Sequence, residues 1–138
     1  MLFTIYGDGG SRGNPGPAGS GAIIRNEKGE TVATVSEYLG VTTNNVAEYT
    51  AILRALETLS TLLEGEAKNA RVRVCMDSML VVRQMKGEWK IKHPNMKPLA
   101  ARVFELARLF GDVTYEHVYR EHNKDADRLA NEAMDRGV

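Results

Sequence analysis

Apolar and polar residues alternate along the first part of the chain, which is the pattern of strands with one buried face. The alternation is clear over residues 2–6 and 31–35, and residues 22–25 are again rich in strand-forming side chains. We expect the first strand to end where the Gly-Asp-Gly-Gly string at positions 7–10 begins, and the Gly, Pro, Ser and Asn residues that continue to position 21 exclude a helix. The pattern therefore predicts three leading strands, joined by turns and paired antiparallel.

A helical period replaces this alternation in the middle of the chain. Apolar residues recur three or four positions apart at 52, 56, 59 and 63, and Thr43, Asn44 and Asn45 precede them as candidate N-caps. Further along, we expect strands at residues 71–76 and 113–118, and helices at 78–86 (capped by Ser78), 97–110 and 123–136. Leading strands followed by alternating strands and helices are typical of an α/β fold with a mixed sheet.

Composition narrows the class of protein. With 138 residues, 43% of them apolar, the chain is large enough for one domain, residues 1–138, that folds without disulfides or a structural metal. Its single cysteine, Cys75, lies in an apolar run and is expected to be buried in a protein of a reducing compartment. The sequence shows neither a leader peptide nor a membrane segment, so we expect a cytoplasmic protein that does not bind membranes.

The formal net charge is zero, but the charges are unevenly distributed. Residues 83–108, which we call the basic segment, contain seven Lys and Arg against two Glu, a local excess of five positive charges. Such a segment suits the phosphates of a nucleic acid, and its candidate contacts are Lys86, Trp89, Lys90 and Lys92. Two structural alternatives stay open, namely a solvated basic face and, for Trp89, packing in the core.

Four carboxylates stand at positions where catalytic groups are common, namely Asp8, Glu48, Asp77 and Asp127. Each has a simpler structural explanation. The first would be a turn residue, the second a capping-box partner of Asn45, the third a helix cap and the fourth half of an ion pair with Lys124. The sheet topology favours a joint function instead, because the carboxyl ends of strands and the first turns of the following helices meet at one edge.

Four carboxylates at one edge would repel each other and would need a positive partner. Hard divalent cations such as Mg²⁺ or Mn²⁺ prefer oxygen ligands. Two such ions about 4 Å apart can activate a water, hold a phosphate and stabilise a leaving oxygen. The sequence therefore indicates a site for a pair of divalent cations.

Four groups of residues follow one another as DGGS (8–11) with NPGPAG (14–19), TTNNVAE (42–48), DS (77–78) and NKDADRLA (123–130). In this order they resemble type 1 ribonuclease H over essentially the whole chain. The resemblance implies a ribonuclease H-like α/β fold, with a five-stranded mixed sheet of three antiparallel and then parallel strands, flanked by helices. It also implies an endonuclease that hydrolyses the RNA strand of RNA/DNA hybrids by two-metal-ion catalysis and leaves 5′-phosphate and 3′-hydroxyl ends.

The resemblance also assigns roles to the four carboxylates. It implies that Asp8 bridges two Mg²⁺ ions, for which Mn²⁺ is the expected substitute. Glu48 and Asp77 would hold the ion that activates water, with Glu48 also placed to sense the ribose 2′-hydroxyl that distinguishes RNA from DNA. Asp127 would hold the second ion, on the leaving-group side.

Residues that contact the hybrid are implied in the same way. The asparagines at positions 14, 44 and 45 match minor-groove contacts, where an amide serves donors and acceptors. The threonine at 43 matches a position that binds a DNA-strand phosphate, with the asparagine at 95 as its expected partner, and the loop after Asp8 lets the backbone approach the RNA. The residues that the resemblance implies as contacts of the hybrid are Gly10, Ser11, Asn14, Thr43, Asn44, Asn45 and Asn95.

The loop after the fifth expected strand departs from the family's pattern. Many members have a histidine on this loop, but here the loop is short and Arg120 stands seven residues before Asp127, as in a short-loop subgroup in which arginine replaces the histidine. We expect Arg120 to stabilise the phosphate electrostatically, because its guanidinium stays charged. His122 is the second choice, and His117 is expected to be packed within the strand.

A second departure lies after residue 84, where some members insert a long basic protrusion that binds substrate. This chain has only a short segment there, so binding would depend on individual residues such as Lys86, Trp89 and Lys90. The short-loop subgroup also allows a relaxed activity on RNA–DNA junctions or double-stranded RNA. We expect the protein to act as a monomer.

Three other classes share some of these features. A ribonuclease H domain that binds hybrids without cutting them is disfavoured, because a binding module has little use for four clustered carboxylates. A dinucleotide-binding loop is disfavoured because the glycines at 7, 9 and 10 do not match G-x-G-x-x-G, and Arg12 stands in place of the third glycine. A transposase or resolvase relative would share the fold and the metal chemistry, but such proteins have different motifs and larger chains.

Overall fold

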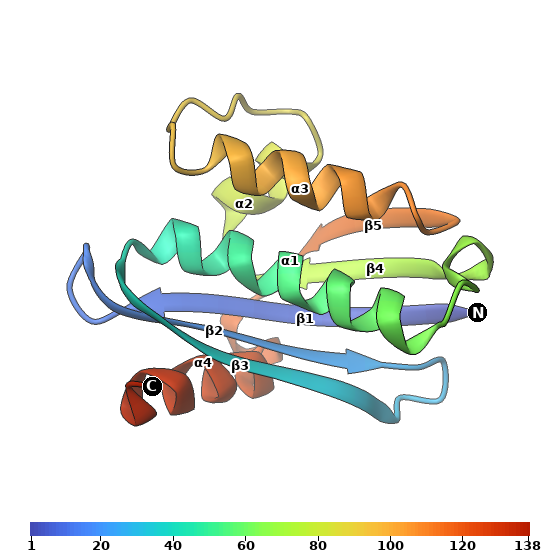
Figure 1. The fold of residues 1–138 in the computed structure, drawn as a ribbon, viewed down its shortest axis with the longest axis horizontal. Helices are drawn as coiled ribbons and strands as arrows, with labels where there is room; N and C mark the ends of the chain where they lie inside the picture. Colours follow the sequence, from blue (N-terminus) through green and yellow to red (C-terminus); the bar gives the residue numbers. More distant parts are fainter.

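The computed structural model describes residues 1–138 and contains one five-stranded sheet in the order β3-β2-β1-β4-β5 (Figure 1). Its strands are β1 (Leu2–Ser11), β2 (Gly16–Arg25), β3 (Thr31–Thr42), β4 (Arg71–Met76) and β5 (Asp112–His117). The first three strands pair antiparallel, whereas β4 pairs parallel with both β1 and β5. The predicted mixed sheet, with three antiparallel strands followed by parallel ones, is confirmed.

Helices cover both faces of the sheet (Figure 1). On one face, α1 (Asn44–Leu62) packs on β1 and β2 and against α3 (Lys97–Ala107), and α4 (Lys124–Arg136) packs on β1, β2 and β3 from the other face. The remaining helical elements are α2 (Met79–Met85), η1 (Ala67–Asn69) and η2 (Arg120–His122), the last two being single turns of 3-10 helix. None of the helices combines the length and the apolar character that crossing a membrane requires.

The main core lies between the sheet and the helices α1 and α3. Strand residues such as Ile5 and Val74 belong to one cluster of 22 buried residues together with Ile52, Leu56 and Leu59 of α1. The helical spacing predicts four buried positions, of which these three are confirmed, whereas the fourth, Leu63, is the C-cap of α1 and is partly buried. Burial of each such side chain contributes about 1.5–3 kcal/mol, which is enough to hold α1 on the sheet. Cys75 of β4 is also buried, as predicted.

The first three strands are longer than the sequence pattern predicts. The prediction that the first strand ends before Asp8 is wrong, since β1 continues to Ser11, and β2 begins at Gly16 instead of position 22. The added residues pair antiparallel, from Asp8 opposite Gly21 to Ser11 opposite Ala18, and β3 extends with them to Thr42. Glycine has a low strand propensity. Here the helices lie so close to the sheet that side chains at several of these positions would not fit.

The later elements agree closely with the predictions. The bounds of β4 are those predicted, β5 is shifted by one residue, and α4 begins at Lys124. Ser78 caps α2 as expected, with its hydroxyl accepting a hydrogen bond from the N–H of Val81 at 3.3 Å. The helix predicted to reach residue 110 ends at Ala107, because the N–H groups of Leu109 and Phe110 bond three residues back in a turn.

Candidate active site

Two of the four candidate carboxylates lie side by side on neighbouring strands. In the parallel part of the sheet, Gly7 of β1 is level with Met76 of β4. Asp8 and Asp77 are the next residues of their chains, so they start about 4.8 Å apart, which is the spacing of paired strands. Asp77 leaves the sheet, whereas Asp8 stays within β1 because its antiparallel pairing with β2 continues. The expectation that these two carboxylates meet at one edge therefore agrees with the backbone register.

A close approach of α1 to β1 places Glu48 beside them. A Cβ on Gly9 would overlap the backbone of Ala47 and Glu48, so the helix reaches this position only because residue 9 is glycine. The buried Ser20 hydroxyl donates to the Ala47 carbonyl at 2.6 Å and ties the same turn to β2. Thr43 caps the helix and Glu48 is only 6% exposed. Glu48 is therefore not the capping-box partner of Asn45.

A second close approach brings Asp127 to the site from the opposite face. Gly21, the residue opposite Asp8, leaves no room for a Cβ beneath the backbone of Ala126 and Ala130 in α4. The buried Asn123 side chain donates from its Nδ2 to the Gly7 carbonyl at 2.9 Å, so the start of α4 is fixed to the residue before Asp8. Asp127 forms no ion pair with Lys124 or any other basic residue, so the surface-pair explanation is wrong.

The electrostatics of the site show that these carboxylates interact. Burial, the charge of Asp77, and hydrogen bonding with and the charge of Asp127 raise the pKa of Asp8 from 3.8 to about 8, against a smaller lowering by the N–H of Gly9. Burial raises the pKa of Glu48 from 4.5 to about 7, with Asp77 adding to the rise and the Ser78 hydroxyl opposing it. Without a cation the site therefore disfavours the fully ionised state.

The donor set fits a divalent cation. All four side chains offer carboxylate oxygens, which Mg²⁺ and Mn²⁺ prefer, and none of them is paired with a Lys, Arg or His. No three acidic, His or Cys side chains form a ready-made cation cage. The interactions are pairwise instead, with Asp8 next to Asp127 and Asp77, and Glu48 next to Asp77. Residues from both faces of the sheet thus meet at one edge.

The residues expected to contact a minor groove lie beside this edge. The Asn14 side-chain oxygen accepts a hydrogen bond from the Asn44 N–H at 3.2 Å and lies 3.5 Å from the Ser11 hydroxyl. The turn after β1 and the start of α1 are therefore joined. The Thr43 hydroxyl accepts from the N–H of Val46, and no hydrogen bond links Thr43 to Asn95, which instead donates its N–H to His93 at 3.1 Å. The expectation that Thr43 and Asn95 bind the same phosphate of the DNA strand stays a prediction.

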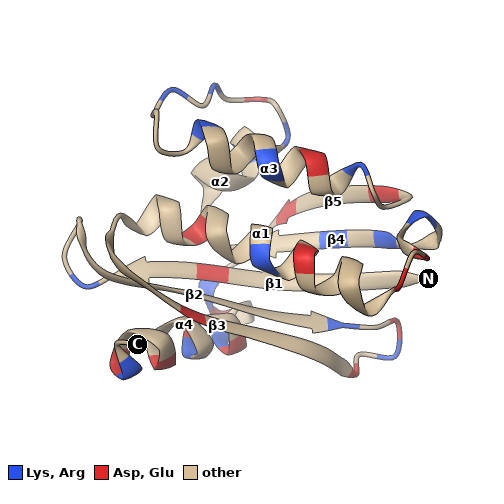
Figure 2. Ribbon diagram, viewed as in Figure 1, with Lys and Arg blue, Asp and Glu red and all other residues tan.

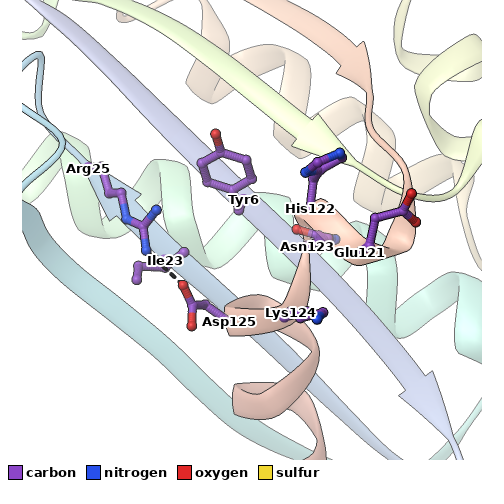
Figure 3. Close-up of a pocket in the computed structure, with 8 residues that line it drawn as sticks. All are labelled: Tyr6, Ile23, Arg25, Glu121, His122, Asn123, Lys124 and Asp125. Atoms are coloured by element: carbon purple, nitrogen blue, oxygen red, sulfur yellow. Dashed lines mark hydrogen bonds and ion pairs between the residues drawn. The ribbon is translucent and has the colours of Figure 1, made fainter.

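Arg120 and His122 occupy different surroundings. An open groove of about 710 Å³ has Arg120 and Asp127 in its lining. His122 instead lines a pocket of about 220 Å³ on the α4 face, beside Tyr6 and Asn123 (Figure 3). His117 is half-buried at the end of β5, as predicted. Of Arg120 and His122, only Arg120 lines a groove together with one of the four candidate carboxylates.

Most of the cations in the basic segment are free. Figure 2 shows Lys and Arg along the loop between α2 and α3. Only Arg83 and Arg102 are ion-paired, with Glu88 and Glu57, and the remaining Lys and Arg residues are exposed. Trp89 is 49% exposed, so its alternative placement in the core is wrong.

Sequence patterns miss the residues that support the site. Ser20 and Gly21 position α1 and α4 without being titratable or part of a motif, and only the tertiary contact gives them a role.

Known proteins resemble this chain over nearly its whole length. A family model described as reverse transcriptase-like matches residues 7–133. The bifunctional protein Rv2228c of Mycobacterium tuberculosis is 47% identical over 136 residues, which are 98% of this chain but only 36% of that protein. Ribonuclease H of Ruegeria pomeroyi is 35% identical over 150 residues, covering 96% of this chain and 92% of that protein.

A solved structure extends the similarity to three dimensions. The crystal structure of LC11-RNase H1 in complex with an RNA/DNA hybrid matches with a TM-score of 0.91 and 46% identity, and the match covers 97% of each chain. Together with the nearly full-length match to a bacterial ribonuclease H, this shows that the chain belongs to the ribonuclease H family.

Proposed function

We propose that this chain is an endoribonuclease that hydrolyses the RNA strand of RNA/DNA hybrids and leaves 5′-phosphate and 3′-hydroxyl ends. Two Mg²⁺ ions, replaceable by Mn²⁺, would assist the reaction, and RNA–DNA junctions or double-stranded RNA would be secondary substrates. We further propose that it works as a monomer in the cytoplasm. The observation that supports the activity best is the buried Asp8 carboxyl, which faces Asp77 and Asp127 with no basic side chain to neutralise it.

Each residue has a distinct part in this proposal. Asp8, Glu48, Asp77 and Asp127 would hold the cations, which when bound supply an activated water and neutralise charge on the phosphate. Glu48, on the face of α1, would also accept a hydrogen bond from the ribose 2′-hydroxyl, which DNA lacks. Arg120 would stabilise the negative charge of the phosphate from the groove that it shares with Asp127.

The substrate would extend to both sides of this edge. The joined Asn14 and Asn44 would contact the minor groove on one side, with Ser11, Gly10 and Asn45 nearby. The free cations Lys86 and Lys90 would contact phosphates on the other side, with Trp89 exposed between them. Thr43, the N-cap of α1, would contact a phosphate of the DNA strand, with Asn95 as its partner.

The test is cleavage of a hybrid whose RNA and DNA strands have different labels, with Mg²⁺, with Mn²⁺ and with chelator. We expect metal-dependent cutting of the RNA strand alone, and no cutting by Asp8→Asn or Asp77→Asn. Asp112→Asn is the matched control, because this aspartate is exposed and unpaired at the start of β5. Tight hybrid binding without cutting under every metal condition would instead identify a binding module.

A further inference from the structure

The ring of Tyr119 is exposed and yet held in place. Its exposure is 68%, whereas Tyr49 and Tyr115 are buried in the core. Single exposed apolar residues are common on protein surfaces. This one differs because the His117 ring meets it edge to face, with centroids 5.7 Å apart and planes at 81°. The contact limits the freedom of this exposed ring, so a ligand that packs on it would cost little further side-chain entropy.

The position of this ring relates it to the candidate active site. His117 is level with Met76, and the Val118 N–H continues the ladder by donating to the Met76 carbonyl at 2.9 Å. Tyr119 is therefore the first residue beyond the ladder, one strand over from Asp77. Strand spacing and rise put the two backbones about 6–8 Å apart, roughly the length of one nucleotide.

The backbone and the neighbouring charge favour a nucleic acid strand at this ring. The Tyr119 carbonyl accepts a hydrogen bond from the His122 N–H at 2.9 Å, which fixes the turn η2. The next residue, Arg120, lines the groove with Asp127, and Lys124 and Arg128 balance the charges of Glu121 and Asp125 there. An aromatic face beside a cation is the arrangement by which proteins hold the sugars and bases of a strand while the cation meets its phosphates.

We propose that Tyr119 binds the substrate, with its ring packed against a sugar of the RNA strand about one nucleotide from the scissile phosphate. This inference rests on the proposed function and adds a contact that the carboxylates do not supply. The ring touches no reacting atom, so its contact is the same before and during bond cleavage. It should therefore lower KM and leave kcat almost unchanged.

The test compares Tyr119→Ala and Tyr119→Phe in steady-state cleavage of a labelled hybrid and in fluorescence anisotropy of the same hybrid in chelator. We expect Tyr119→Ala to raise KM and Kd by about tenfold, with kcat within about twofold, since the substitution removes the aromatic contact and no catalytic group. Tyr119→Phe keeps the ring and should stay within about twofold of the wild type. Leu62→Ala, at an exposed position at the far end of α1, is the control for loss of an exposed apolar side chain.

Shortened substrates locate the contact. Hybrids shortened up to the cleavage site on the side that Tyr119 contacts should abolish the difference in KM between the wild type and Tyr119→Ala. Hybrids shortened on the opposite side of the cleavage site should preserve this difference. Equal KM values for Tyr119→Ala and Leu62→Ala would overturn the proposal. A loss in Tyr119→Phe as large as that in Tyr119→Ala would also overturn it, because the hydroxyl and not the ring would then bind. If the wild type cuts no hybrid, the proposed function fails, and the anisotropy measurement still decides whether Tyr119 binds the strand.

Discussion

Replacing Asp8 with asparagine should stabilise the metal-free protein. The asparagine keeps the size of the side chain but removes the charge that burial, Asp77 and Asp127 make unfavourable. Because the folded pKa of Asp8 is raised, its contribution to the free energy of unfolding is fully present below about pH 4 and is lost as the pH rises to about 8.

The magnitude follows from the pKa. A rise from 3.8 to about 8 corresponds to an upper limit of about 6 kcal/mol when the carboxyl is forced to ionise in the fold. Outward movement of the exposed Asp127 and entry of water would relieve part of this cost. We expect a gain of about 2–4 kcal/mol for Asp8→Asn at pH 9, or roughly 6–15 °C in Tm for a domain of this size.

The assay is urea and thermal unfolding of the wild type and Asp8→Asn in chelator between pH 4 and pH 9. The difference should be small at pH 4 and grow through neutral pH, whereas Asp112→Asn, the exposed and unpaired control, should show no such trend. Added Mg²⁺ should stabilise the wild type more than Asp8→Asn. A difference independent of pH, or a less stable Asp8→Asn at pH 9, would refute the electrostatic account of this site.

Three further predictions concern the groove lined by Arg120, the basic segment and the packing of α4 on the sheet. Arg120→Ala should lower kcat about tenfold without changing the metal requirement, and Arg120→Lys should recover part of the lost kcat. An unchanged kcat in Arg120→Ala would show that Arg120 is a solvated surface residue without a role in the reaction. Raising the salt concentration should weaken hybrid binding. Combining Lys86→Ala with Lys90→Ala should reduce the slope of log Kd against log salt concentration by about 2. A Kd that does not change with salt would show that the basic segment does not contact the hybrid. Gly21→Ala should lower Tm and activity together because a Cβ would displace α4, whereas Gly10→Ala, whose Cβ would have ordinary contact distances, should keep its Tm; equal Tm values would contradict the close-packing argument.

Local chemistry explains why part of the fold could be predicted from the sequence. The apolar run of β4, the Ser78 cap of α2 and the helical spacing along α1 depend on near neighbours in the chain, and the structure confirms all three. The prediction is wrong mainly for the glycine-rich C-terminal part of β1 and N-terminal part of β2, which it placed outside the strands. Their strand conformation is stabilised by pairing and by helices packed closely above and below them, and a propensity read from one segment cannot include such contacts.

The sequence by itself determined which residues are chemically able to form the site: four carboxylates, an arginine near the last of them, and the glycines of residues 7–21. Only the tertiary structure decided how they meet. The register of β1 and β4 sets Asp8 beside Asp77, and Gly9 and Gly21 allow α1 and α4 to bring Glu48 and Asp127 from opposite faces. The close approach of these four carboxylates depends on backbone contacts between residues far apart in the chain. It therefore arises only when the whole sheet and its helices have packed.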